Sequence, residues 1–216
     1  NPIAVSDEEI VNFDVPTFVY GSQPYNQIGV TSNGYIVVGG GTGQDVEYNP
    51  PGIPHPSLPN NVLAPFWTDL DGSTSTGIRA VTLTDGVNSW IAIEWQMNPW
   101  GTVDNEQTFQ VWIGTNGVED VTFVYDPDNL PSSPLPTVVG AENINGSGGD
   151  SLGMDVFPTE DLAVTNSEPV PGGSYTYTVE VTGLLPGNAY VTTTKNSDIV
   201  PGTTVVSTDV TVQPRF

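Results

Sequence analysis

Three hairpin signals constrain the fold of this chain more than any other feature. The dipeptides Asn33-Gly34, Asp85-Gly86 and Asn116-Gly117 favour tight turns between antiparallel strands, because Asn and Gly tolerate the positive φ that such turns need. Each dipeptide is flanked by runs rich in Val, Ile, Thr and aromatic residues, which are typical of strands. The sequence therefore predicts an all-β fold, an antiparallel β-sandwich of the jelly-roll or immunoglobulin-like kind.

The alternation of apolar and polar residues locates the strands. We expect them at residues 13–20, 27–31, 35–38, 62–68, 78–84, 90–97, 108–113, 120–126 and 137–142. Pro16 interrupts the first strand and predicts an edge position or a β-bulge. Trp90 and Trp95 fall on opposite faces of their strand, which predicts a central position in its sheet. A long proline-rich loop begins at Gly39, and loops of that length are usually functional or mobile.

The charge balance limits the partners of the chain. It has 216 residues, with 3 Lys and Arg against 25 Asp and Glu, a net charge of -22. Such a surface repels nucleic acids and anionic lipid headgroups and attracts divalent cations. Adaptation to saline water, where counterions screen the repulsion, is an alternative explanation. The chain has no cysteine, which excludes disulfides and thiolate chemistry, and no apolar run approaches the roughly 20 residues of a membrane span. We expect no nucleic-acid partner and no membrane insertion.

The composition changes after Pro158. We expect a β-sandwich domain over residues 1–158 and a smaller Thr/Val-rich β segment over residues 159–216. The second segment is too short for a seven-stranded sandwich. It is interpreted as a partial immunoglobulin-like segment that closes on itself, joins the first sheet or donates strands to a neighbouring chain. The start at Asn1-Pro2, without Met, predicts a piece processed or excised from a longer precursor.

Five motifs carry a family resemblance. They are FDVPTFVYGSQPYNQIGVTSNGYIVVGG at 13–40, NNVLAPFWTDLD at 60–71, WIAIEW at 90–95, TFQVWIGTNGVEDVTFVYD at 108–126 and VVGAENINGSGGDS at 138–151. In this order they resemble the C-terminal β-sandwich accessory module of secreted bacterial subtilisin-like serine proteases. APFWTDLD and TFQVWI are also similar, more distantly, to the extracellular domain of nidogen. The stretch PGGSYTYTVEV resembles the immunoglobulin-like repeats of bacterial surface proteins.

The resemblance implies a secreted, non-catalytic accessory or adhesive module. The Gly-Thr-Ser-Met-Ala nucleophile segment of subtilisin-like proteases has no counterpart here, so any protease would lie outside this chain. The only histidine, His55, lies among prolines near Ser57, without the strained elbow or oxyanion hole that a serine nucleophile needs. We expect Glu94 to be a hydrogen-bonded strand residue and the chain not to be an enzyme.

Asp69, Asp71 and Ser73 follow the apolar run 62–68 in the pattern D-x-D-G-S. Alternating oxygen ligands on a tight loop are typical of calcium sites. The twelfth position counted from Asp69 is Ala80 and not Glu, so the loop is not an EF-hand. The sequence predicts a calcium site here, completed by carbonyls or a remote carboxylate; the alternative is an Asx turn that closes the strand.

Two further acidic turns are weaker candidates for metal ligands. Asp104 and Glu106 lie in one, and Asp126 and Asp128 in the other. Each turn alone is more typical of a solvated loop. If Asp104 or Glu106 approaches Asp69 at one end of a sheet, these two acidic loops together form one metal site.

The five tryptophans include one candidate for ligand contact. Trp67, Trp90, Trp95 and Trp112 lie in strand patterns, which favours core packing over sugar binding. Trp100, between Pro99 and Gly101, lies in a turn and is the first candidate for ligand binding, with Tyr48 second.

Two functions fit this sequence. The first is a non-catalytic extracellular binding or accessory module of a secreted hydrolase or adhesin, stabilised by calcium, whose partner is a protein or carbohydrate at the cell surface or matrix. The second is a structural subunit of an extracellular filament that self-associates by β-strand addition, in which main-chain hydrogen bonds supply much of the affinity.

Overall fold

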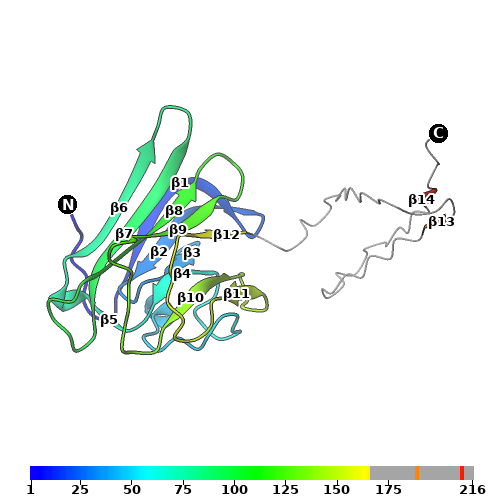
Figure 1. Cartoon of the computed structure of the whole chain (residues 1–216). Helices are drawn as coiled ribbons and strands as arrows, with labels where there is room; N and C mark the ends of the chain where they lie inside the picture. Colours follow the sequence, from blue (N-terminus) through cyan, green and yellow to red (C-terminus); the bar gives the residue numbers. More distant parts are fainter. Residues whose placement is uncertain (166–187, 190–209, 212–216) are drawn as a thin grey trace. The chain divides into compact units, whose positions relative to one another are not determined.

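The computed structural model describes residues 1–165, 188–189 and 210–211 (Figure 1). The chain divides into two compact units, Asn1–Val170 and Pro171–Phe216. In the second unit the described residues form the antiparallel pair β13 (Asn188–Ala189) and β14 (Val210–Thr211). The predicted immunoglobulin-like strands and any strand donation by this segment lie outside the described residues.

One sheet of the first unit has the order β1-β2-β3-β4-β10-β11, with antiparallel neighbours. Its strands are β1 (Ile10–Tyr20), β2 (Gln23–Thr31), β3 (Ile36–Val38), β4 (Val62–Trp67), β10 (Val138–Glu142) and β11 (Gly149–Ser151). The pairing of β1 with β2 shifts register between Asp14 and Phe18. Pro16 lies at this shift, and β1 lies at the sheet edge, so both expectations for Pro16 are confirmed.

The second sheet has the order β12-β9-β8-β7-β5, and β6 pairs with β7 in line with β5. Its strands are β5 (Leu70–Asp71), β6 (Gly77–Thr84), β7 (Ser89–Pro99), β8 (Gln107–Gly114), β9 (Val121–Tyr125) and β12 (Leu162–Val164). β7 is central, as predicted. Because β12 pairs with β9, the first unit extends beyond the boundary expected at residue 158.

The main hydrophobic core lies between the two sheets. Trp95 of β7 stacks on Phe109 of β8, with ring centroids 5.2 Å apart, and its Nε1 donates a hydrogen bond of 2.8 Å to the carbonyl oxygen of Thr31 in the opposite sheet. Burying each large apolar side chain stabilises the fold by about 1.5–3 kcal/mol. The predicted all-β sandwich is confirmed. Within the described residues, helical structure is limited to the 3-10 turns η1 (Gly43–Asp45) and η2 (Gly72–Thr74), and none of it is long and apolar enough to cross a membrane.

The proline-rich loop after β3 covers a second, smaller core on the outer face of the first sheet. Tyr35 and Trp67 pack there with ring centroids 4.3 Å apart. The Tyr35 hydroxyl donates to the Asp45 carbonyl at 2.6 Å and accepts from Glu47 N at 2.8 Å. Trp67 Nε1 donates to the Glu47 carbonyl at 2.8 Å. These hydrogen bonds hold the loop against the smaller core, and β4 is therefore buried on both faces.

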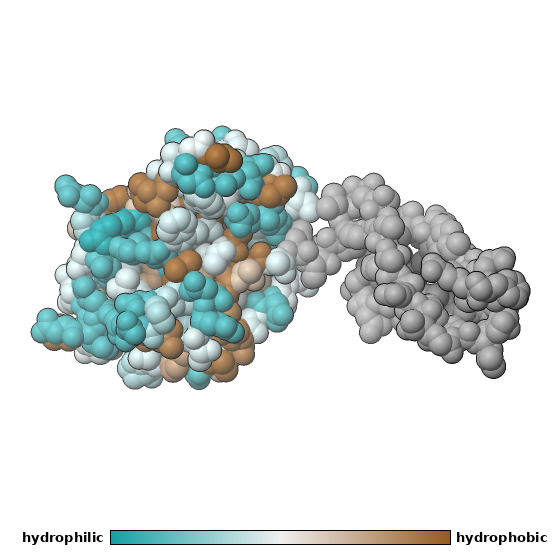
Figure 2. All heavy atoms as spheres, turned by 45° about the horizontal axis from the view of Figure 1, so that its top comes forward, coloured by the Kyte–Doolittle hydropathy of each residue, from teal (hydrophilic) through white to brown (hydrophobic). Residues whose placement is uncertain are grey.

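The expectation of core packing is confirmed for Trp67 and Trp95 and wrong for Trp90 and Trp112. Trp67 and Trp95 are 1% and 0% exposed, whereas Trp90 and Trp112 are only half-buried. The strand alternation places both on the outer face of the second sheet. On the face in Figure 2, hydrophilic residues surround smaller hydrophobic groups.

Candidate functional site: a carboxylate cluster

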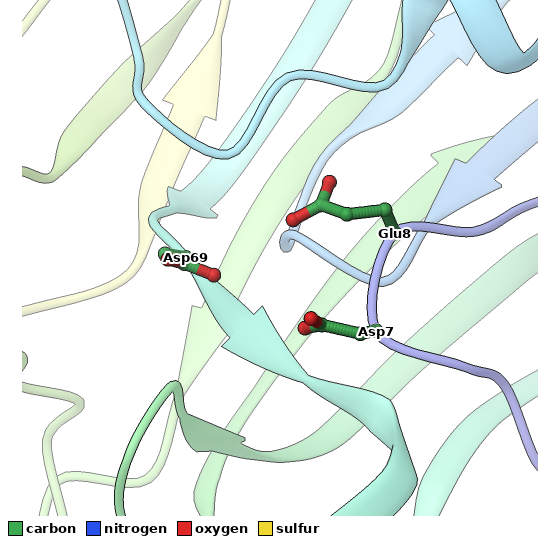
Figure 3. A group of neighbouring side chains, drawn as sticks. All are labelled: Asp7, Glu8 and Asp69. Carbon is green, nitrogen blue, oxygen red and sulfur yellow. The ribbon is translucent and has the colours of Figure 1, made fainter.

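Three carboxylates from two distant parts of the sequence meet beside β5. Asp7 and Glu8 belong to the segment that precedes β1, and Asp69 lies between β4 and β5. One oxygen atom of each lies within 4.8 Å of those of the other two. Figure 3 shows the three side chains converging on one space. Among the described residues, no other group of three acidic, histidine or cysteine side chains comes together in this way.

The turn between β2 and β3 positions both arms of the cluster. Asn33 Nδ2 donates to Glu8 Oε2 at 2.9 Å, and Asn33 Oδ1 accepts from Leu70 N at 3.0 Å. The Asn33 carbonyl accepts from Thr68 N at 3.3 Å. A single asparagine thus holds Glu8 next to the link that carries Asp69.

The N-terminal segment is also attached on either side of Asp7 and Glu8. Ile3 forms an isolated bridge with Ile78 of β6, through hydrogen bonds of 2.7 and 3.0 Å. Ser32 N donates to the Glu9 carbonyl at 2.8 Å. Gly72 permits the segment to pass closely, because a Cβ there would come within 2.5 Å of the Ser6 carbonyl oxygen. The segment is thereby tied to both sheets, and it places its acids beside Asp69.

The surroundings of the cluster disfavour negative charge. Burial raises the pKa of Asp69 to about 6, and the charges of Asp7 and Asp71 add to the rise. Burial and the charge of Asp71 also raise the pKa of Asp7. Glu8 is exposed, and partial desolvation raises its pKa despite its hydrogen bond from Asn33. The ionised form of each carboxylate is therefore disfavoured in the folded protein relative to the unfolded chain.

Two oxygen atoms in the cluster lack a hydrogen-bond partner among the described residues. They are Asp7 Oδ1 and Asp69 Oδ1, and both are shielded from solvent. A buried charged oxygen without a partner is costly. A bound cation would remove this cost and the mutual repulsion together, so the donor set fits a hard metal ion.

The D-x-D-G-S loop divides between two roles. Asp69 belongs to the cluster. Asp71 instead caps η2: its Oδ1 accepts hydrogen bonds from Ser73 N at 2.8 Å and from Ser73 Oγ at 2.5 Å. Asp71 and Ser73 thus form the Asx turn that was the alternative interpretation of this loop.

The other predicted acidic residues lie outside this cluster, and Glu106 contacts a distant segment. Glu106 Oε1 accepts from Thr76 N at 2.5 Å. Asp104 has a positive φ of 56° in the loop after β7. Asp126 Oδ1 accepts from Asp128 N at 3.0 Å. None of these four acidic residues belongs to the cluster around Asp69.

Sequence reasoning missed Asp7 and Glu8. The run Asp7-Glu8-Glu9 has no ligand spacing and resembles a solvated terminal segment. The available signal was the position of three consecutive acids directly before the first strand, but nothing in the sequence states which loop they approach.

The two predicted ligand-binding aromatic residues are exposed, Trp100 by 55% and Tyr48 by 54%. Trp100 N donates to the Asp69 carbonyl at 2.9 Å, so this turn adjoins the cluster. His55 Nδ1 accepts from Ser57 N at 3.3 Å. Glu94 is a hydrogen-bonded strand residue, as expected, and forms an ion pair with Arg79.

The fold and its carboxylate cluster define an antiparallel β-sandwich module with a candidate metal centre. The chain belongs to the family described as NIDO related, whose model matches residues 4–194. This membership agrees with the distant nidogen resemblance and indicates an extracellular, non-catalytic module in general terms. The chain matches no curated protein and no solved structure.

Proposed function

We propose that this protein is an extracellular, non-catalytic binding module stabilised by a calcium ion that Asp7, Glu8 and Asp69 hold. The observation that carries the proposal is the pair of buried, unpartnered oxygens, Asp7 Oδ1 and Asp69 Oδ1, in a group of three carboxylates. Repulsion alone would separate these side chains, and the hydrogen bonds of Asn33 hold them together instead.

Calcium fits the chemistry of the cluster better than other common metals. Its donors are carboxylate oxygens without histidine or cysteine, which favours a hard cation over zinc or copper. Calcium takes about 6–8 oxygen ligands in irregular arrangements and binds extracellular modules with a Kd of about 10⁻⁴–10⁻³ M. Magnesium demands near-octahedral geometry and retains its water. Water and nearby carbonyl groups would complete the calcium shell.

The proposed role of the ion is to fasten the N-terminal segment to the sandwich. That segment carries the buried Val5 and the bridge from Ile3 to β6. An ion shared by Asp7, Glu8 and Asp69 would join this segment to the β4–β5 link. Binding only to the folded state stabilises it according to the ratio of free calcium to Kd.

The proposal extends to the parent protein and the partner. The ordered motifs over residues 13–151 support an accessory module carried by a secreted hydrolase, such as a subtilisin-like protease, or by an adhesin. The partner is a protein or carbohydrate at the cell surface or in the matrix. Trp100 and Tyr48 are ligand-contact candidates, because both are exposed.

Thermal unfolding of the full chain in calcium, in magnesium and in chelator tests the metal. We expect a higher Tm in calcium than in chelator, with a smaller effect of magnesium. Asp69→Asn should remove the calcium effect, and Asp126→Asn, the same charge change in a turn outside the cluster, should retain it. Equal melting temperatures in calcium and chelator would exclude the ion.

A filament subunit remains the second candidate because one sheet edge is open. Beyond the bridge at Ile78, β6 pairs on one side with β7, and within the described residues no strand pairs with its other side. Val81 and Leu83 are exposed there by 47% and 38%. Such an edge accepts an added strand. Size-exclusion chromatography with electron microscopy decides between the two: discrete particles support the binding module, and ordered polymers support the filament.

A further inference from the structure

The outer face of the second sheet carries a hollow lined by two tryptophans. Its lining is Trp90, Trp112, Asp120, Thr122 and Val124, and its volume is about 290 Å³. The strands that form its floor are β7, β8 and β9, the middle of the sheet. The hollow therefore rests on strands that are each paired on both sides.

The register of β7 and β8 gives each tryptophan a small neighbour. Trp90 pairs with Gly114, and Ala92 pairs with Trp112. The two indole rings lie on a diagonal, 6.3 Å apart between centroids and inclined by 62°. Because Gly114 and Ala92 occupy the other diagonal, both rings have room beside them, and the inclined pair forms two walls of the hollow.

Asp120 adds an acceptor at the rim of the hollow. A Cβ on Gly114 would come within 2.6 Å of Asp120 Oδ2, so the absence of a side chain at position 114 lets this carboxylate approach the sheet. Gly114 N also donates to the Asp120 carbonyl at 2.7 Å.

A chain of polar side chains continues from the hollow along the same face. Trp112 Nε1 donates to Gln110 Oε1 at 2.7 Å, and Gln110 Nε2 donates to Glu94 Oε2 at 2.7 Å. Glu94 pairs with Arg79, which also donates to Gln96 Oε1 at 2.7 Å. This row of hydrogen-bonded side chains fixes the plane of the Trp112 ring. It also presents planar donors and acceptors to solvent, and the Arg79 side chain is 38% exposed.

The combination matches the surface of a sugar. A pyranose ring has an apolar face of C–H groups, which packs on an aromatic ring, and a rim of hydroxyl groups that both donate and accept hydrogen bonds. Tryptophan supplies a large apolar face, and carboxylate, amide and guanidinium groups supply the polar partners. We infer that this hollow and the adjoining polar chain bind a neutral saccharide.

Charge and size favour this occupant over others. Arg79 is the only Lys or Arg before residue 195, and Glu94 pairs with it. Within the part of the chain that the structure describes, this face therefore has no free basic side chain for a polyanion. The hollow, at about 290 Å³, is just smaller than the roughly 300–1,000 Å³ typical of small-ligand pockets. One or two sugar units are the better fit.

The inference deepens the proposed role as a binding module, and it replaces Trp100 with Trp90 and Trp112 as the principal ligand contacts. Isothermal titration of the full chain with neutral β-linked hexasaccharides of glucose, N-acetylglucosamine, mannose and xylose tests it. Sedimentation with cellulose and chitin distinguishes a polysaccharide surface from a free oligosaccharide, and heparin serves as the charged comparison.

We expect binding to at least one neutral probe and none to heparin. Trp112→Ala and Trp90→Ala should each lower the affinity about tenfold, the scale of one lost aromatic contact. Trp112→Phe keeps an aromatic face and loses the bond to Gln110, so it should lower the affinity less than Trp112→Ala does. It also serves as a control in case the alanine variant does not fold. Val87→Ala, which truncates a side chain that is 90% exposed and lies outside the hollow, should leave it unaltered. Trp100→Ala tests the other ligand-contact candidate.

No binding to any neutral probe would overturn the inference, as would binding that survives Trp112→Ala or is lost only in Trp100→Ala. A dimer in light scattering that dissociates in Trp112→Ala would assign the face to a second copy of the chain instead. The calcium effect on melting is measured separately, so failure of the saccharide and failure of the metal are distinguishable.

Discussion

Replacing Asp69 by asparagine should have opposite effects with and without calcium. The pKa of Asp69 is raised from 3.8 to about 6, so its ionised form is disfavoured in the folded state. The unfolded chain loses this proton at lower pH than the folded protein does. Stability in chelator therefore falls as the pH rises from about 4 to about 6 and remains lowered above that.

The magnitude follows from the size of this shift. About two pKa units correspond to at most about 3 kcal/mol, and solvent screening of this partly exposed group reduces the expected penalty to about 1–2 kcal/mol. At pH 7.5 in chelator, Asp69→Asn should be more stable than the parent by that amount, or about 2–8 °C in Tm. In calcium at 100 times its Kd, the parent gains about 2.7 kcal/mol and the order of the two proteins reverses.

Urea and thermal unfolding of both proteins across this pH range provide the assay. Asp126→Asn is the matched control, because it makes the same charge change in an exposed turn. Destabilisation by Asp69→Asn in chelator would refute the electrostatic reasoning. An unchanged calcium effect in that variant would refute the assignment of the ligand.

Three further substitutions test other parts of the structure. Glu142 is 2% exposed, and burial raises its pKa to about 7, so stability should fall as the pH rises from about 4.5 to 7. In urea titrations, Glu142→Gln should raise the free energy of unfolding by up to about 3 kcal/mol at pH 8 and change it little at pH 4. Equal stability of the variant and the parent at pH 8 would contradict this. Gly34→Ala should cost more than about 3 kcal/mol, because φ is 77° and the new Cβ would lie 2.1 Å from the Phe66 carbonyl oxygen. Gly86→Ala, with φ of 91° and open space around the new Cβ, should cost only about 1 kcal/mol of stability. Similar losses in Gly34→Ala and Gly86→Ala would show that the contact with the Phe66 carbonyl oxygen is unimportant. Asp71→Ala should cost about 1 kcal/mol through loss of the η2 cap without altering the calcium effect on Tm, whereas loss of that effect would make Asp71 a metal ligand.

The strand pattern could be predicted because it is local. Side chains alternate along a strand, and Asn-Gly or Asp-Gly turns fix where strands reverse. β4, β6, β7, β8, β9 and β10 accordingly lie within two residues of their expected positions. The short strands β5, β11 and β12 escaped prediction, because two or three residues contain too little alternation.

The two tryptophans of the outer sheet face show why a pattern can be correct and its interpretation wrong. Alternation placed Trp90 opposite Trp95 along β7, as observed. It did not state which face of the sheet would be covered, because that depends on which other elements pack against it. The hollow around Trp90 and Trp112 is thus a property of the assembled sheet.

The sequence by itself determined the all-β class, the acidic surface and the role of Asp69 as a candidate ligand, since each follows from composition or from neighbouring residues. Only the tertiary structure decided that Asp7 and Glu8 join Asp69, while Asp71 turns to Ser73. Contacts between residues 7 and 69 arise when Asn33 and the packed sheets bring distant segments together. No local pattern encodes that approach, because the partners of a loop are set by the whole fold.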